Sequence, residues 1–218
     1  MMKRALTYDD VNIVPKYSEL ESRGNVKLNT KFTKNTELTI PIVSSPMDTI
    51  TEYDMALEMM KWGGVGVVHR FMSIDEQVEI ISKLKQVSGV NVEILDSPIC
   101  AAVGVTGDYL ERAEELVKNG CNVLLIDVAH GHHKLVGEAI EKIKTRLSSV
   151  EVVAGSVATG EACEYLCEKG ADSIRVGIGN GSLCETRIRT GVGIPQVTAL
   201  LECVAVADSY NTPVIADG

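Results

Sequence analysis

The sequence has few aromatic residues, no long apolar run and no apolar stretch near its start. Aromatic side chains make up 4% of the 218 residues, and apolar runs such as residues 65–68 and 123–126 are no longer than a strand. A membrane-spanning helix needs roughly 20 apolar residues, and a secretory signal needs an apolar core behind its basic start. We therefore expect a cytoplasmic protein with neither a membrane span nor a signal peptide.

The sequence also lacks an excess of positive charge. It has 21 lysines and arginines against 30 aspartates and glutamates, which gives a formal net charge of −9. Nucleic acids and anionic membranes are themselves negatively charged, so this balance argues against general attraction to either. The charge favours a small-molecule partner.

Closely paired cysteines are missing as well. The six cysteines include no Cys-x-x-Cys pair and are scattered over positions 100, 121, 163, 167, 184 and 203. This spacing fits neither a disulfide framework nor a zinc site. We expect reduced thiols.

Short apolar segments alternate with amphipathic segments from about residue 38 onwards. This pattern predicts βα units that build a parallel sheet, and the apolar segments are continuous because such strands are buried on both faces. The seven predicted strands are residues 39–44, 64–69, 99–105, 122–128, 151–155, 173–177 and 213–217.

Helices are predicted between these strands. Thr51 with Asp54 and Ser73 with Glu76 have the spacing of capping boxes, so helices are expected to begin there. Four further helices are predicted at residues 109–119, 134–147, 161–169 and 195–208.

A parallel sheet of this kind is either an open doubly wound sheet or a (β/α)8 barrel. A dinucleotide-binding doubly wound sheet has a glycine fingerprint after its first strand, where this chain has residues 43–47 (VSSPM). In barrels the functional loops follow the C-terminal ends of the strands, and the polar and glycine-rich segments occupy those positions. We predict an α/β fold, a (β/α)8 TIM barrel forming one catalytic domain over residues 1–218. Because only seven strands are counted, we expect it to lack the eighth βα unit and to be inactive alone.

Residues 177–184 (GIGNGSLC) combine alternating glycines with a cysteine after a strand. Glycines let the backbone approach a ligand closely, and exposed amides and carbonyls in such a loop can hold an ion. Cys184 lies beside amide dipoles, Thr186 and Arg187, which are the surroundings of a nucleophile with a lowered pKa. The alternative is a turn with an incidental buried thiol, and the spacing alone leaves both interpretations open.

Histidines are the remaining candidates for metal ligands. His130, His132 and His133 are close in sequence, but no fourth ligand is evident, so we favour loop geometry over a metal site. His69 follows a predicted strand and is expected to be a hydrogen-bonded residue at the edge of the core.

Five segments occur in order along the chain. They are residues 6–11 (LTYDDV), 44–49 (SSPMDT), 127–132 (DVAHGH), 177–184 (GIGNGSLC) and 215–218 (IADG). Together they resemble the IMP dehydrogenase / GMP reductase family over essentially the whole chain. The resemblance implies a barrel oxidoreductase that acts at C2 of a purine nucleotide through a covalent cysteine intermediate, with NADPH or NAD as cofactor.

The resemblance also implies roles for single residues. Cys184 resembles the nucleophile, and Thr186 resembles the threonine that helps to activate water or ammonia. Asp127 resembles a residue that faces the cofactor ribose. The carbonyls of Gly179, Gly181 and Cys184 match those that hold a monovalent cation, such as potassium, in the dehydrogenases.

Substrate contacts are implied in the same way. Asp217 resembles the carboxylate that accepts both ribose hydroxyls, and an ionised carboxylate suits a diol because it accepts two charge-assisted hydrogen bonds. Ser182 resembles a contact on the phosphate side. Ser45 and Met47 resemble residues that flank the nucleotide, and Gly218 follows Asp217 in the same motif.

Three residues depart from the family pattern. Asn180 stands where proline or serine is more usual, and Ser156 stands where asparagine is usual. Glu185 replaces threonine or isoleucine, and a carboxylate beside the nucleophile opposes thiolate formation unless it points away.

The two branches of the family give different expectations. Dehydrogenases usually insert a regulatory domain of paired CBS modules, for which the connection over residues 87–98 has no room. Residues 69–71 and 189–191 resemble the reductases, whereas residues 63–66 and 193–196 resemble the dehydrogenases. We therefore lean to a GMP reductase that converts GMP and NADPH to IMP and ammonia. The alternatives are an IMP dehydrogenase, which converts IMP and NAD to XMP, and a truncated non-catalytic nucleotide-binding relative. The family suggests a homo-oligomer, with a tetramer as the expected state.

Overall fold

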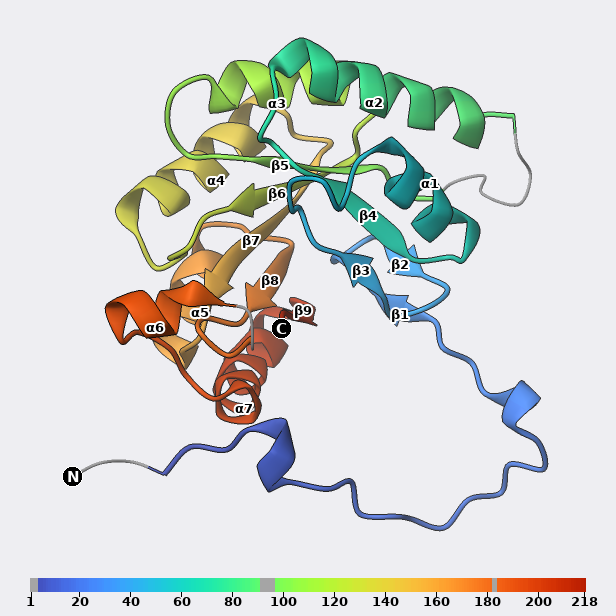
Figure 1. Ribbon diagram of the computed structural model, residues 1–218, viewed down its shortest axis with the longest axis vertical. Coiled ribbons are helices and arrows are strands. Elements are labelled where there is room, and N and C mark those ends of the chain that lie inside the picture. Colours follow the sequence, from blue (N-terminus) through green and yellow to red (C-terminus); the bar gives the residue numbers. More distant parts are fainter. Residues whose placement is uncertain (1–3, 91–96, 182–183) are drawn as a thin grey trace.

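The computed structural model describes residues 4–90, 97–181 and 184–218, which form an α/β fold around one curled parallel sheet (Figure 1). Each strand of this sheet pairs in parallel with the next one along the chain. The strands are β3 (Val43–Ser44), β4 (Val65–Val68), β5 (Cys100–Val103), β6 (Val123–Asp127), β7 (Glu151–Val157), β8 (Ser173–Val176) and β9 (Val214–Ala216). All seven predicted strands are confirmed, and the sheet is a partial (β/α)8 barrel in which β3 and β9 are the outer strands.

Helices follow the strands and lie on the outside of the curled sheet (Figure 1). They are α1 (Tyr53–Lys61), α2 (Ile74–Ser88), α3 (Tyr109–Lys118), α4 (Lys134–Arg146), α5 (Gly160–Glu168), α6 (Glu185–Thr190) and α7 (Gln196–Ala207), which continues into the 3-10 turn η4 (Asp208–Tyr210). The larger apolar cluster joins all of these helices except α6 to the outer face of the sheet, through residues such as Leu124, Ile126 and Ile140. Helix α6 was not predicted.

The inner face of the sheet has an apolar cluster of its own. Strand side chains alternate between faces, so Val123 and Leu125 of β6 point inward while Leu124 points outward. A short hairpin of β1 (Thr30–Lys31) and β2 (Glu37–Leu38) covers this cluster with Phe32 and Leu38. The hairpin was not predicted.

The capping boxes had different outcomes. The one at Ser73 is confirmed, because its hydroxyl accepts from the N–H of Glu76 while the Glu76 carboxylate accepts from the N–H of Ser73. The one at Thr51 is wrong. Thr51 is buried, and its hydroxyl bonds to the Ser44 hydroxyl and the Ser45 carbonyl. These bonds connect the two sides of the turn after β3.

The segment before β1 is mostly extended and exposed. It contains two 3-10 turns, η1 (Tyr8–Asp10) and η2 (Arg23–Asn25). Near its start, Leu6 hydrogen-bonds with Thr198 of α7 through both its N–H and its carbonyl. Across the described part of the chain, none of the helices has the length and apolar character needed to cross a membrane.

Candidate active site

The parallel strands all end at one edge of the sheet, and a cavity of about 420 Å³ opens there. Loops after β4, β6, β8 and β9 line it, together with Ser156 of β7. Residues Asp127, Gly179, Gly181, Cys184, Thr186, Asp217 and Gly218, all predicted site residues, lie in its wall. The structure therefore brings together residues from distant parts of the sequence.

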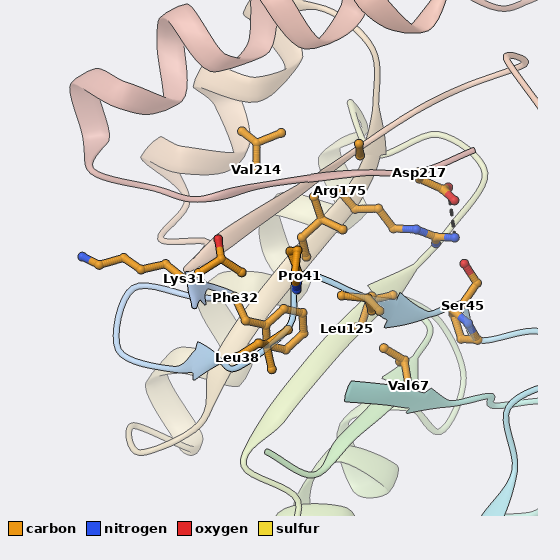
Figure 2. Close-up of a pocket in the computed structure, with 15 residues that line it drawn as sticks. Lys31, Phe32, Leu38, Pro41, Ser45, Val67, Leu125, Arg175, Val214 and Asp217 are labelled. Atoms are coloured by element: carbon orange, nitrogen blue, oxygen red, sulfur yellow. Dashed lines mark ion pairs between the residues drawn. The ribbon is translucent and has the colours of Figure 1, made fainter. Parts of the chain in front are cut away.

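A second cavity of about 200 Å³ lies inside the curl of the sheet (Figure 2). Phe32 and Leu38 of the hairpin and Leu125 of β6 give it an apolar floor, and Ser45 lies in its wall. Arg175 and Asp217 line both cavities. These two side chains thus stand between the apolar interior of the sheet and the mouth of the site.

Strand alternation explains why three charged side chains meet at this edge. Asp127 follows the inward-facing Leu125 by two residues, and Asp217 follows the inward-facing Ile215 by two. Arg175 lies between the outward-facing Ile174 and Val176. One Nη atom of Arg175 is 3.0 Å from Asp127 and the other is 3.0 Å from Asp217, so one arginine bridges both carboxylates.

A second arginine, Arg70, approaches Asp127 from the loop after β4. Its Nη2 donates to the Asp127 carbonyl over 3.2 Å, and its Nε lies 3.9 Å from the Asp127 carboxylate. That Nε is buried and has no hydrogen-bond partner among the described residues. The guanidinium also lies 5.1 Å from the centre of the Phe71 ring, which is exposed at the cavity wall. The site therefore offers positive charge and an aromatic face beside Asp127.

The glycine-rich loop after β8 is tied to the end of β9. Asn180 donates a 2.7 Å hydrogen bond to the carbonyl of Asp217. Gly177 has a φ of +153°, and a Cβ on it would lie 2.2 Å from that same carbonyl, so only glycine fits. Asn180, a departure from the family pattern, thus holds the loop against a predicted substrate residue.

Cys184 is partly exposed at the start of α6. Interactions with the Thr186 hydroxyl, and then with the Thr186 N–H, hold the pKa of the Cys184 thiol below its usual value. Glu185 forms an ion pair with Arg189 one turn along the same helix, so its charge is compensated there. By contrast, Cys100 is fully buried, and its burial raises the pKa of its thiol. The pKa of the Cys203 thiol is also lowered, by its hydrogen bond with Cys163, but Cys203 is buried. Cys184 combines a lowered pKa with exposure to the cavity, as a nucleophile requires.

Two predicted site residues, Met47 and Ser182, are not placed in either cavity wall. Met47 is exposed on the turn after β3 and is not part of either cavity wall. Ser182 lies outside the described residues. Gly181 is in the cavity wall, but its carbonyl already accepts from the N–H of Cys184, and the predicted cation site stays a prediction.

His69 is the hydrogen-bonded residue at the core edge that the sequence predicted. It is 2% exposed and lies with Asp48 and Glu52 in a group compact enough to hold a metal ion. Its Nδ1 accepts the N–H of Phe71, which leaves the ring proton of neutral imidazole on Nε2. Nε2 then faces Glu52 at 3.3 Å as a donor, so this histidine orders a loop and has no free lone pair for a metal.

Two of the three clustered histidines pack against each other, with 6.4 Å between the ring centres of His130 and His132. His133 begins α4, where its Nδ1 accepts the N–H of Leu135. His132 packs against Tyr165 of α5, with 5.4 Å between ring centres. These contacts agree with the predicted loop geometry.

Sequence reasoning missed the two arginines of the site. From the sequence, Arg175 is only a residue of the predicted strand 173–177, and Arg70 is only part of the segment 69–71 that resembles the reductases. A charged residue within an otherwise apolar buried strand is the signal that could have found Arg175, because such a charge needs a partner.

Comparisons with known proteins identify the relationship. The family model for the IMP dehydrogenase / GMP reductase domain matches residues 5–218. An inosine-5'-monophosphate dehydrogenase of Cryptosporidium parvum is 38% identical over 250 aligned positions, covering 99% of this chain and 62% of the relative. Another, from Borreliella burgdorferi, is 38% identical over 258 positions, covering 99% and 64%.

A third relative, from Nitrosopumilus maritimus, bears the same name and is 29% identical over 332 positions, covering 99% of this chain and 70% of the relative. The chain spans just under two thirds of the length of the first two relatives. With the curled parallel sheet and the cysteine loop at its C-terminal edge, these matches show that the chain belongs to the IMP dehydrogenase / GMP reductase family.

Proposed function

We propose that this protein is an NAD-dependent IMP dehydrogenase, which oxidises IMP to XMP. The observation that carries the proposal is the position of Cys184. Its thiol has a lowered pKa and shares one cavity with two carboxylates, Asp127 and Asp217, at the C-terminal edge of the sheet. The names of the relatives supply the reaction class, since they are all called inosine-5'-monophosphate dehydrogenase.

The proposed chemistry begins with the thiolate of Cys184, which attacks C2 of the purine base. A nicotinamide cofactor bound beside Asp127 would supply the acceptor for the hydride of C2. Water then adds to C2, and the carbon–sulfur bond breaks to release XMP and the cysteine. Thr186 lowers the pKa of the thiol and lines the same cavity, where it is suited to orient the incoming water.

The carboxylates are proposed to bind the two riboses. Each has one oxygen on Arg175 and is partly exposed to the cavity, so Asp217 can accept hydroxyls of IMP and Asp127 those of the cofactor. Arg70 and Phe71 beside Asp127 offer a positive charge and an aromatic face to the cofactor.

The comparisons favour the dehydrogenase over the GMP reductase to which the sequence analysis leaned. That preference depended on the reductase-like segments 69–71 and 189–191 and on the short connection after α2. Only residues 89–99 join α2 to β5. The Nitrosopumilus maritimus relative aligns over 332 positions and therefore carries extra residues, but the Cryptosporidium parvum relative needs only 250 and has the same name. A short connection therefore does not distinguish the two reactions. We infer one catalytic barrel domain without the paired regulatory insert.

Paired assays on the full-length protein test the proposal. Formation of NADH from IMP and NAD is expected, with XMP as the product. Conversion of GMP and NADPH to IMP and ammonia, without IMP oxidation, would show that the reductase assignment is correct. The Cys184→Ala variant serves as the control for contaminating activity.

A further inference from the structure

Arg175 connects two carboxylates that the proposed function assigns to different ligands, and the inference below rests on that proposed function. The Arg175 side chain is 13% exposed, and those of Asp127 and Asp217 are 19% and 26% exposed. Charges this well shielded from water interact strongly, and two unpaired carboxylates in one cavity would repel each other. The bridge is therefore a substantial interaction at the centre of the site.

The sheet is built to allow this bridge. Arg175 is in β8 and Asp127 is at the end of β6, so the side chain has to pass β7 between them. The β7 residue opposite Asp127 is Gly155. A Cβ at Gly155 would lie 2.7 Å from the Cβ of Arg175 and 2.5 Å from its carbonyl oxygen, so the missing side chain lets Arg175 approach β7. On the other side, β9 brings Asp217 to the second nitrogen.

The bridge leaves acceptors free for ligands. Arg175 contacts Oδ1 of Asp127 and Oδ2 of Asp217, one oxygen of each carboxylate. The other oxygen of Asp127 has Arg70 Nε at 3.9 Å, which is longer than a hydrogen bond. Each carboxylate can therefore hold the guanidinium and accept hydroxyls at the same time.

We propose that Arg175 is a positioning residue that couples the IMP site to the cofactor site. A ligand bound to Asp217 fixes the guanidinium, and the planar guanidinium then fixes Asp127. The second ligand meets a carboxylate that is already ordered, so less conformational entropy is lost when it binds. Each ligand thus increases the affinity for the other by the same factor.

Calorimetric binding of IMP to the full-length protein tests this coupling. Arg175→Met keeps an unbranched apolar stem but removes the charged guanidinium, and we expect it to weaken IMP binding at least tenfold and to abolish the effect of NAD on IMP affinity. Arg175→Lys should recover only part of the loss, because an ammonium group is a point charge without a fork to hold both carboxylates. The matched control is Arg146→Met, which breaks an exposed 2.8 Å pair with Glu114 and should leave IMP binding unchanged.

A second substitution separates positioning from simple structural damage. In Arg175→Met, the additional change Asp127→Asn removes the repulsion between the carboxylates, so IMP should bind at least threefold more tightly than to the single variant. When Asp127→Asn is introduced into the wild type, it should not tighten IMP binding. If Arg175→Met does not fold, the same comparison in Arg175→Lys decides the matter.

The two proposals fail in different ways. Wild-type protein that binds no IMP would overturn the proposed function. Wild-type protein that binds IMP, together with an Arg175→Met variant that binds it equally well or gains nothing from Asp127→Asn, would overturn the role of Arg175 alone.

Discussion

The carboxylates at the two edges of the sheet differ in how many of their oxygens have partners within the protein. At the N-terminal edge, Glu151 begins β7 and its two oxygens accept four hydrogen bonds from residues of the hairpin segment, Thr33, Asn35 and Thr36. At the C-terminal edge, Asp127 and Asp217 each give one oxygen to Arg175 and keep the other toward a cavity.

Because of this difference, the carboxylate at the N-terminal edge contributes to stability and those at the C-terminal edge are available for binding. A carboxylate with all its acceptors satisfied holds two segments together, whereas one with a free oxygen can accept a ligand. Barrels follow the same division, with functional groups at the C-terminal ends of the strands and stability at the other end. Substitutions at the two edges should therefore affect different measurements.

The largest effect is expected at Cys184. Cys184→Ala should lower turnover by roughly a thousandfold or more, because it removes the nucleophile, and should leave the free energy of unfolding nearly unchanged. Steady-state kinetics and urea denaturation measure the two quantities. Cys203→Ala is the converse control, since Cys203 lies on the buried face of α7 and its loss should reduce stability and retain turnover. A purine adduct on any other cysteine would contradict the assignment.

Asp217→Asn should come next. The loss of charge-assisted hydrogen bonds, worth about 1.5 to 3 kcal/mol, predicts a rise of roughly 10- to 100-fold in the Kd for IMP. Calorimetric titration and thermal unfolding together measure the effect. If Asp217→Asn changes the free energy of unfolding more than the free energy of IMP binding, the comparison between the two edges is wrong.

Glu151→Gln should affect stability and not the Kd for IMP. Burial raises the pKa of Glu151, but the hydrogen bonds from Thr33, Thr36 and Asn35 outweigh it and leave the pKa below the ordinary value of 4.5. We expect the variant to lose about 1 to 3 kcal/mol at neutral pH.

The pH dependence sharpens this prediction. Because the pKa is lowered by folding, the stabilisation by ionised Glu151 is fully present above pH 4.5 and is lost as the pH falls through the folded value. The difference in unfolding free energy between wild type and Glu151→Gln should therefore shrink in acid. Urea denaturation over a pH series measures it, and a difference that stays constant down to complete protonation would contradict the account.

The smallest effect concerns the pKa of Cys184. Thr186→Val removes the hydroxyl that contributes most to lowering it, so alkylation of Cys184 should reach half its maximal rate at a higher pH. Mass spectrometry of the alkylated peptide gives the rate at each pH. Thr190→Val on the same short helix is the control and should leave the profile unchanged, whereas an equal shift in both variants would point to the helix as a whole.

Much of the fold could be predicted because the buried strands are continuous apolar runs of strand length. The hairpin could not, since β1 and β2 have two residues each and show no period. Thr51 had the spacing of a cap, but its partners are the hydroxyl of Ser44 and the carbonyl of Ser45, and such contacts are visible only in three dimensions.

The candidate site was predictable in part for the same reason. Parallel strands bring their C-terminal loops together, so a sequence with polar segments after its strands indicates where the site lies. The bridge by Arg175 depends on the absent side chain of Gly155 and on the order of four strands, β6 to β9. No local pattern contains that information.

The contact between Leu6 and Thr198 closes residues 7–29 into a loop. The other end of this loop is anchored by β1 of the hairpin. Closing a chain of that length opposes the contact by roughly 3 kcal/mol. The two hydrogen bonds that hold Leu6 contribute about 1 to 3 kcal/mol in total. Release and capture of the segment are therefore nearly balanced. Because Tyr8 and Gly179 line one cavity, release of the segment would open the back of the cysteine loop.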